Sequence, residues 1–483
     1  MSDLDNEPML ITNKIEEANA EPNGNAIHPH SNGRLGGYVL EPAVFLVLFA
    51  RCLIDAVYQN QILYQTCLQA LHYNSTQCDP FLGIDRSSEE SKRIEVQVQE
   101  YAANIIMVSS LMESFFPAVV SLFFGPWSDK FGRRPILLAA FVGYLSSSII
   151  LTAITQISLR ENISPWWYIL YSVPSIFSGG FCSVCAVSFC YISDVTTAKT
   201  RPMRMVLMDA AISVGLIGGS VTSGYIYELT TAAPLFMISG SLMAISLIYL
   251  IIWVPESLRH EHLSHSHRLH ELFRMDLLKD LWHTCCQSRG HSENLIIWLT
   301  MLALTIHIFA AEGDNSVNLL FIREQFDWTV KDFSIFYVAR LFIQILGSIL
   351  VLSVLRRFVK LSIHGMAILC LGCIVLESTT RATAQYSYEI YLGLVLGIMR
   401  GVLGPMSKTI LSEVTPSSEV GKIFALSSSL QAVTPSLAVP LYTTVYKTTV
   451  ENYPGAFNVI SLGLNFLGFI LMNVVYCIQK STE

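Results

Sequence analysis

Long apolar stretches with few charges recur along the chain. A helix needs roughly 20 mostly apolar residues to cross a bilayer, because the hydrocarbon layer is about 30 Å thick and a helix rises about 1.5 Å per residue. Twelve stretches approach or exceed this length, and each is predicted to be a membrane-spanning helix. They cover 39–63, 100–124, 135–157, 166–191, 204–227, 232–254, 294–321, 333–355, 361–380, 387–411, 421–446 and 456–478.

The basic residues between these stretches predict their orientation. The loops after even-numbered stretches carry about twice as many lysine and arginine residues as the other loops, counting Arg204 with the fourth loop and Lys408 with the tenth. Loops rich in lysine and arginine lie on the cytoplasmic side of a membrane. Because the number of stretches is even, both termini are predicted to be cytoplasmic.

The loops predicted to lie outside carry two glycosylation sequons, at Asn74 and Asn162. Asn74 is the favoured acceptor, because its loop is longer and more polar. Cys67 and Cys78 flank the same loop. In an oxidising compartment they can form a disulfide, and the alternative is a pair of free thiols.

The longest inner loop, residues 255–293, divides the chain into two groups of six predicted helices. The expected organisation is a cytoplasmic tail (1–38), a first half (39–254), the central loop (255–293), a second half (294–478) and a short cytoplasmic tail (479–483). An internal echo supports this division: Ser-Asp-Val-Thr at 193–196 ends the fourth stretch, and Ser-Glu-Val-Thr at 412–415 ends the tenth. Such an echo is what a duplicated six-helix unit requires.

Composition excludes several classes of protein. Only 14% of the residues are charged and 52% are hydrophobic, whereas soluble domains carry about 25% charged residues. No basic stripe indicates a nucleic-acid partner. No nucleophile elbow, P-loop or metal-ligand quartet is visible, so neither an enzyme nor a bound cofactor is expected.

The central loop is rich in histidine, with His260, His262, His265, His267, His270, His283 and His291. This spacing could hold a metal ion. The alternative, which we favour, is a solvated loop whose charge varies with pH. No metal site is therefore predicted.

The loop between the second and third stretches contains a dense motif. Gly125, Asp129, Gly132, Arg133 and Arg134 follow the pattern G-x-x-x-D-x-x-G-R-R. Gly132 supplies the backbone freedom that a very tight turn needs. Asp129 places a carboxylate at the membrane surface, near helix ends and basic residues that can hold it.

The two arginines of this motif are expected to reach acidic helix ends, with Asp194 as the first candidate partner. Arg201 follows Asp194 closely and is assigned to the same cluster. Such a cluster can close the cytoplasmic side in one state and break in another, so we expect a conformational latch. The alternative is a set of charges that only fixes topology.

This motif resembles that of the major facilitator superfamily. A narrower resemblance, to solute carrier family 46, extends from about Tyr38 to the end of the chain. It rests on Glu41-Pro42, Thr305-Ile306-His307, Pro405-Met406-Ser407-Lys408 and the segment Glu419–Ala425. The resemblance implies an all-α membrane protein with the major facilitator fold, twelve transmembrane helices in two six-helix halves, and proton-coupled transport.

The resemblance also suggests site residues. Folate-transporting members of the family couple protons through an acidic residue in the fifth helix, matched by Asp209, and carry a histidine in the seventh, matched by His307. An arginine in their tenth helix is matched by Lys408, and an aspartate in their fourth by Gly180. Because lysine cannot form the paired hydrogen bonds of arginine, folate itself is not assigned as the substrate.

Charges within the predicted helices point to the same regions. Charged side chains are costly in a bilayer and usually face a cavity or one another. Glu312 and Asp314 flank Gly313, and the stretch 310–315 is predicted to be a locally broken helix. Both acids are further candidates for proton coupling.

Arginines are the remaining candidates for anion binding. Arg340 and Arg400 join Lys408 in this role, although Arg400 could instead pair with Glu377. Arg51 and Asp55 are four residues apart and can pair on one helix face.

The function predicted from the sequence is proton-coupled secondary transport of a small organic anion, either folate-like or muropeptide-like. The alternative is a non-transporting transceptor or scaffold with the same fold. The expected partners are protons, the anion and the bilayer. A segment at 5–10 resembles an acidic dileucine signal, and the alternative, which we favour, is a disordered tail that no sorting machinery recognises. Members of the family that this chain resembles occur at the plasma membrane and in lysosomes, so the membrane is predicted to be one of these two.

Overall fold

The computed structural model describes the chain in ten segments, all within one unit, Gly37–Glu483. These segments are 39–78, 89–258, 274–277, 279, 292–326, 328, 330–359, 361–416, 418–449 and 452–482. Every element in them is a helix, as predicted. The sorting segment at 5–10 and all seven histidines of the central loop lie outside the described residues.

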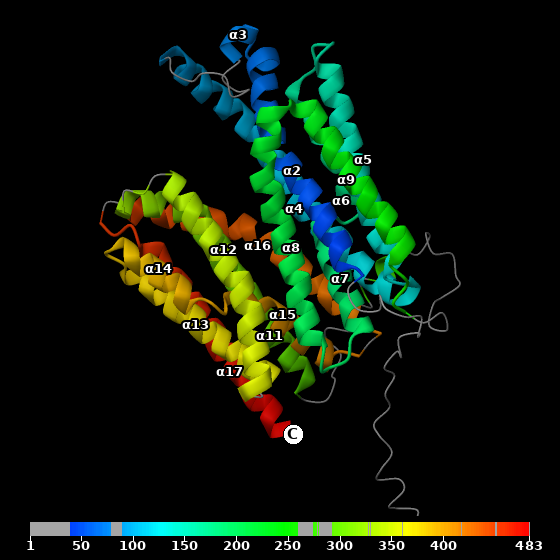
Figure 1. The fold of residues 1–483 in the computed structure, drawn as a ribbon, viewed down its shortest axis with the longest axis vertical. Coiled ribbons are helices and arrows are strands. Elements are labelled where there is room, and N and C mark those ends of the chain that lie inside the picture. The colour runs from blue at the N-terminus through cyan, green and yellow to red at the C-terminus, as the bar shows by residue number, and fades with distance from the viewer. Residues whose placement is uncertain are drawn as a thin grey trace, which may run out of the picture. The chain divides into compact units, whose positions relative to one another are not determined.

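The helices of the first half match the first six predicted stretches. They are α2 (Glu41–Gln65), α4 (Glu89–Phe131), α5 (Arg134–Ser158), α6 (Ser172–Phe177) with α7 (Gly180–Val195), α8 (Arg201–Leu229) and α9 (Ala232–Trp253). In Figure 1, α2 runs beside α8, and contacts also join α2 to α9 and α5 to α9.

The helices of the second half match the other six. They are α11 (Glu293–Phe326), α12 (Val330–Val354), α13 (Ile363–Thr383), α14 (Ser387–Leu396) with α15 (Leu403–Val414), α16 (Val420–Thr449) and α17 (Ala456–Thr482). Here α17 packs against both α11 and α13 (Figure 1). The two halves meet where α16 contacts α4 and α7, and where α8 contacts α15 and α12.

Ten spans among the described residues are long and apolar enough to cross a membrane. An apolar stretch at 338–354 lies within α12. The remaining predicted span is α2, a helix of 25 residues that carries Arg51 and Asp55. These two side chains pair as predicted, at 3.1 Å, and Glu113 of α4 joins them at 2.9 Å.

The fourth and tenth spans are each interrupted, at positions that the sequence did not mark as broken. In the fourth span, Gly179 and Gly180 have φ angles of +77° and +48°, which favour glycine and separate α6 from α7. In the tenth span, α14 ends at Leu396 and a short 3₁₀ turn, Arg400–Val402, precedes α15. The two breaks occur in the spans that correspond between the halves, which agrees with the similar sequences at 193–196 and 412–415.

The predicted break at 310–315 in the seventh span is wrong. The helix α11 runs without interruption from Glu293 to Phe326. Gly313 serves close packing instead, because a Cβ there would overlap the ring of Tyr442. The glycine reflects a contact between α11 and α16, which the local sequence does not reveal.

The second span extends well beyond its predicted start at residue 100, because α4 begins at Glu89. Ile94, Val98, Ala102 and Ile105 recur at helical spacing and are all buried. Ile94 and Val98 pack against Cys67 and Cys78, which the structure joins by a disulfide. A helical extension and a disulfide-closed segment thus form one small outer cluster.

Several basic residues counted as loop charges lie within helices, Lys408 and Arg204 among them. Lys408 lies in α15, which continues to Val414. Arg204 lies in the first turn of α8, and its Nη2 is 2.8 Å from Oε1 of Glu41. Neither residue therefore supports the predicted orientation, which rests on the other loop charges and stays a prediction.

Candidate functional site

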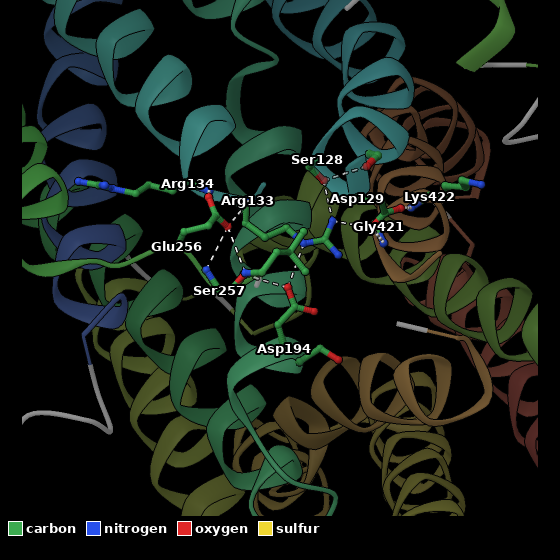
Figure 2. A network of polar contacts seen from close by, with 12 residues as sticks. Ser128, Asp129, Arg133, Arg134, Asp194, Glu256, Ser257, Gly421 and Lys422 are labelled. Atoms are coloured by element: carbon green, nitrogen blue, oxygen red, sulfur yellow. Dashed lines mark hydrogen bonds and ion pairs between the residues drawn. The ribbon is translucent and has the colours of Figure 1, made fainter. Parts of the chain in front are cut away.

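Arg133 is the centre of a buried polar cluster at the end of the bundle (Figure 2). The side chain is fully buried, and a guanidinium in that environment needs close anionic partners. Its Nη1 lies 2.6 Å from Oδ1 of Asp129 and donates to Oγ of Ser128 at 2.7 Å. Its Nε donates to Oδ2 of Asp194 at 3.0 Å, so the predicted contact between Arg133 and Asp194 is present.

Asp129 joins the two halves through main-chain groups. Its Oδ1 accepts from the backbone N–H of Gly421 at 3.0 Å, and its Oδ2 accepts from that of Lys422 at 3.1 Å (Figure 2). These N–H groups belong to the first turn of α16, where they have no partner within the helix. A carboxylate from α4 therefore caps a helix of the second half.

Glycines allow this approach between α4 and α16. A Cβ at Gly125 would lie 2.5 Å from the carbonyl oxygen of Gly421, and a Cβ at Gly421 would lie 2.5 Å from Oδ1 of Asp129. Gly132 has a φ of +107°, so it supplies the tight turn predicted for this position. The motif glycines thus serve both the turn and the contact.

Glu256 and Ser257 complete the cluster, and the sequence analysis did not identify them. Glu256 accepts from the backbone N–H groups of Arg133 at 2.8 Å and Arg134 at 3.1 Å, which caps the start of α5. Ser257 Oγ donates to Asp194 Oδ2 at 2.9 Å. The sequence signal that could have identified Glu256 was an acidic residue just after the sixth span.

Arg134 and Arg201 lie near this cluster with different partners. Arg134 does not bond Asp194 as expected; its Nη2 donates to the carbonyl oxygen of Ile251 at 2.5 Å. Arg201 bridges the two echoed segments, donating to the carbonyl oxygens of Ser193 and Ser412, each at 3.3 Å. Arg201 therefore forms a second link between the halves.

Lys408 and Asp209 lie on α15 and α8, which pack together at the boundary between the halves. Lys408 projects from α15, with Nζ 3.3 Å from the centre of the Phe189 ring on α7. Its charge interacts with that of Asp209 on α8, although no direct ion pair within 4.0 Å joins them.

The second half contains its own buried charges. Arg400 pairs with Glu377, with 2.8 Å between Nη1 and Oε1, which is the alternative the sequence left open. Asp314 pairs with Arg381, with 3.2 Å between Oδ2 and Nη1. Asp314 therefore has a buried arginine as its partner. Glu312 lies half-buried on the same helix and makes no hydrogen bond or ion pair with any residue that the structure describes.

His307 is held by Asn465 of α17. Asn465 Nδ2 donates to the carbonyl oxygen of Ser461 at 2.8 Å, so its Oδ1 is left to face His307 Nδ1 at 2.9 Å. This arrangement requires a proton on Nδ1 and leaves Nε2 as the basic nitrogen. Asn465 was missed because its partner is far away in sequence.

The outer candidates lie on exposed segments. Asn74 and Asn162 are both exposed, and Asn162 Oδ1 accepts from Gln69 Nε2 at 3.0 Å. Within the described parts of the chain, no group of three potential metal ligands occurs. The charged side chains inside the bundle stay candidates for binding protons and anions.

Comparisons with known proteins agree with this architecture. A model of the Major Facilitator Superfamily matches residues 94–439. The "Probable peptidoglycan muropeptide transporter SLC46" of Drosophila melanogaster is 35% identical over 459 residues, covering 94% of this chain and 88% of the relative. The "Proton-coupled folate transporter" of Rattus norvegicus is 22% identical, covering 92% of this chain and 93% of its own length.

Solved structures share the fold at low sequence identity. The human organic anion transporter MFSD10 has a TM-score of 0.66 at 15% identity, over 90% of this chain and 98% of its own. The transporter FucP, in its outward conformation, has a TM-score of 0.61 at 11% identity, with the same coverage. The chain therefore belongs to the Major Facilitator Superfamily and, within it, to the SLC46 transporters.

Proposed function

We propose that this transporter carries a small organic anion together with protons, and that the anion binds between Lys408 and Asp209. The observation that carries the proposal is that α15 and α8, one from each half, pack together and carry opposite charges that form no direct ion pair. A solute bound there would touch both halves, as alternating access requires.

The charges of this pair supply a reason for coupling. While Asp209 is ionised, its carboxylate neutralises the ammonium of Lys408. Protonation of Asp209 leaves the positive charge of Lys408 available to a carboxylate of the solute. Proton binding and anion binding then favour each other, because linkage between two sites is reciprocal.

The solute class follows from the relatives. The Drosophila relative, at 35% identity, is named as a probable muropeptide transporter. Muropeptides combine sugar rings with a short peptide and its carboxylates. Lys408 can bind a carboxylate, and Phe189 beside it offers an apolar ring face. We therefore favour a muropeptide-like solute over a folate.

The latch residues support the conformational part of the proposal. Asp129, Arg133, Asp194 and Arg201 close one end of the bundle, and their contacts would have to break before that end opens. The basic loops predict that this end is cytoplasmic. The membrane is proposed to be plasma or lysosomal, where an acidic outer compartment would drive import toward the cytosol.

Uptake into proteoliposomes tests the proposal. Labelled muropeptide and labelled folate are offered with and without an acidic outside. Wild type should accumulate the muropeptide only with the gradient, whereas Asp209→Asn should exchange solute at equal pH without accumulating it. Asp276→Asn is the matched control, because Asp276 is exposed in the central loop.

Accumulation that remains pH-driven in Asp209→Asn would contradict the role of this residue, and His307, Glu312 and Asp314 would be tested next. Absence of gradient-driven uptake for every solute would favour the transceptor function instead.

A further inference from the structure

A small cavity lies inside the second half, separate from the Lys408–Asp209 pair. It is lined by Arg340 and Gln344 of α12, Glu377 of α13, Leu394 of α14 and Arg400. Its volume of about 10 Å³ corresponds to roughly one water molecule. Only a monatomic ion, a water molecule or the tip of a small group fits this space.

The charges around the cavity do not balance. Arg400 is paired with Glu377, and Arg381 is paired with Asp314. Arg340 is a third arginine whose charge acts on these four groups, and it has no ion pair or hydrogen bond with any residue that the structure describes. The cluster therefore carries one excess positive charge.

The excess charge is deeply buried. Arg340 is 8% exposed and lies near the middle of α12. An unpaired guanidinium in the interior of a membrane protein is strongly disfavoured, so such residues normally face a charge partner or a polar cavity. An anion in the cavity would supply the missing partner.

Arg400 presents a second unused donor. Its Nη2 is buried and makes no hydrogen bond. The second carboxylate oxygen of Glu377 does not accept a hydrogen bond from this Nη2. Oε2 lies against Gly397, where an added Cβ would overlap it, and it has no hydrogen-bond partner either. Two arginines with unused N–H groups thus line one cavity.

We propose that this cavity binds one compact monovalent anion, held by Arg340 and Nη2 of Arg400. Its chemical class is a halide such as chloride, or a carboxylate group of similar width. The site is bounded by helices of the second half alone, so it does not depend on the proposed solute site. Because Arg400 begins the turn before α15, the anion would also stabilise the break in the tenth span.

Binding of radiolabelled chloride to the purified full-length protein tests this site, with gluconate used to hold ionic strength constant. Wild type should bind chloride saturably. Arg340→Gln should weaken binding at least tenfold, since a charge-assisted hydrogen bond accounts for roughly a tenfold to hundredfold change in affinity. Arg274→Gln, an exposed arginine in the central loop, is the matched control.

Two further arms separate the alternatives. Arg340→Lys keeps the charge and should retain weakened binding, which guards against a misfolded Arg340→Gln protein. Formate as competitor shows whether the site also accepts a carboxylate, and either result supports a compact-anion site. Absence of saturable chloride binding in wild type, or unchanged binding in Arg340→Gln, would overturn the proposal. Binding lost in Lys408→Gln but kept in Arg340→Gln would move the anion to the central site and would overturn it as well.

Discussion

Most of the buried charges that the structure describes are neutralised by a neighbour within hydrogen-bonding distance. Arg133 has Asp129 and Asp194, and Arg204 has Glu41. Removing one member of such a pair leaves an uncompensated charge, which strongly destabilises a fold. Lys408 and Arg340 differ, because neither has a direct ion pair, and both lie where we propose an anion to bind.

The role of Lys408 can be measured by substitution. Lys408→Gln should raise the apparent KM for the anion about tenfold or more, because a charge-assisted hydrogen bond contributes about 1.5–3 kcal/mol. Lys408→Arg should be tolerated, since it keeps both the charge and the contact with the Phe189 ring. Uptake rates at equal surface expression provide the measurement, with the exposed Lys447→Gln as control. An unchanged KM in Lys408→Gln would exclude Lys408 as the anion ligand.

Asn465 offers a test of proton binding at His307. Asn465→Asp places a carboxylate beside the imidazole, which favours its charged form, so half-maximal uptake should move to higher pH. Asn465→Leu removes the acceptor of the Nδ1 proton, so half-maximal uptake should move to lower pH. The measurement is uptake as a function of outside pH. Asn473→Asp, on the same helix, is the control, and identical profiles for both Asn465 variants would show that His307 does not carry the proton.

The sequence identified the candidate residues better than their partners. The motif at 125–134 was recognisable because its residues are adjacent. Glu256 and Asn465 were not, because each contacts a residue more than 100 positions away and leaves no local pattern. The expected partner of Arg134 was wrong for the same reason.

At the scale of helices, the extent of the apolar stretches predicted the ends of most spans to within a few residues. It did not predict the breaks in the fourth and tenth spans, because the apolar character of each continues across its glycines. The extension of α4 was missed because its apolar positions, such as Ile94 and Val98, occur only once per turn among polar residues.

The contact between α4 and α16 should be sensitive to small changes. Asp129→Ala removes the cap from α16, which costs about 0.5–2 kcal/mol, so the state closed at this end should become roughly two- to thirtyfold less favoured. The protein should still insert and fold, because Arg133 keeps Asp194 as an anionic partner, but its turnover should be slower. Initial uptake rates per inserted molecule measure this effect, and a normal rate would rule out the latch.

Gly421→Ala is a companion change that keeps the carboxylate of Asp129. Its added methyl group would overlap Oδ1 of Asp129 and the side chain of Arg133. The α4–α16 contact should loosen, and turnover should fall as in Asp129→Ala. Gly463→Ala on α17 is the control, because a Cβ there meets nothing within 4 Å.

At the scale of the whole transporter, hydrogen bonds between the halves bring specific positions together. Ser429 of α16 donates to the carbonyl oxygen of Ala118 on α4 at 2.7 Å. A protein with Ala118→Cys and Ser429→Cys, in a Cys477→Ser background, should form a crosslink on oxidation. Uptake should then stop, because α4 and α16 can no longer separate, and a reductant should restore it. The oxidised Cys477→Ser parent is the control, and full uptake by the crosslinked protein would contradict alternating access through this contact.

The outer disulfide has a consequence for the order of maturation. Asn74 lies between Cys67 and Cys78, and its carbonyl oxygen accepts from the backbone N–H groups of Gln77 and Cys78. An enzyme that attaches a glycan to Asn74 must bind this segment as an open strand, which the disulfide-closed loop with its short helix, Ser75–Cys78, does not offer. Sugar attachment would therefore have to precede oxidation of the two thiols. A nascent chain whose disulfide forms early would leave the secretory pathway without a glycan on Asn74. A single preparation would then contain two glycoforms.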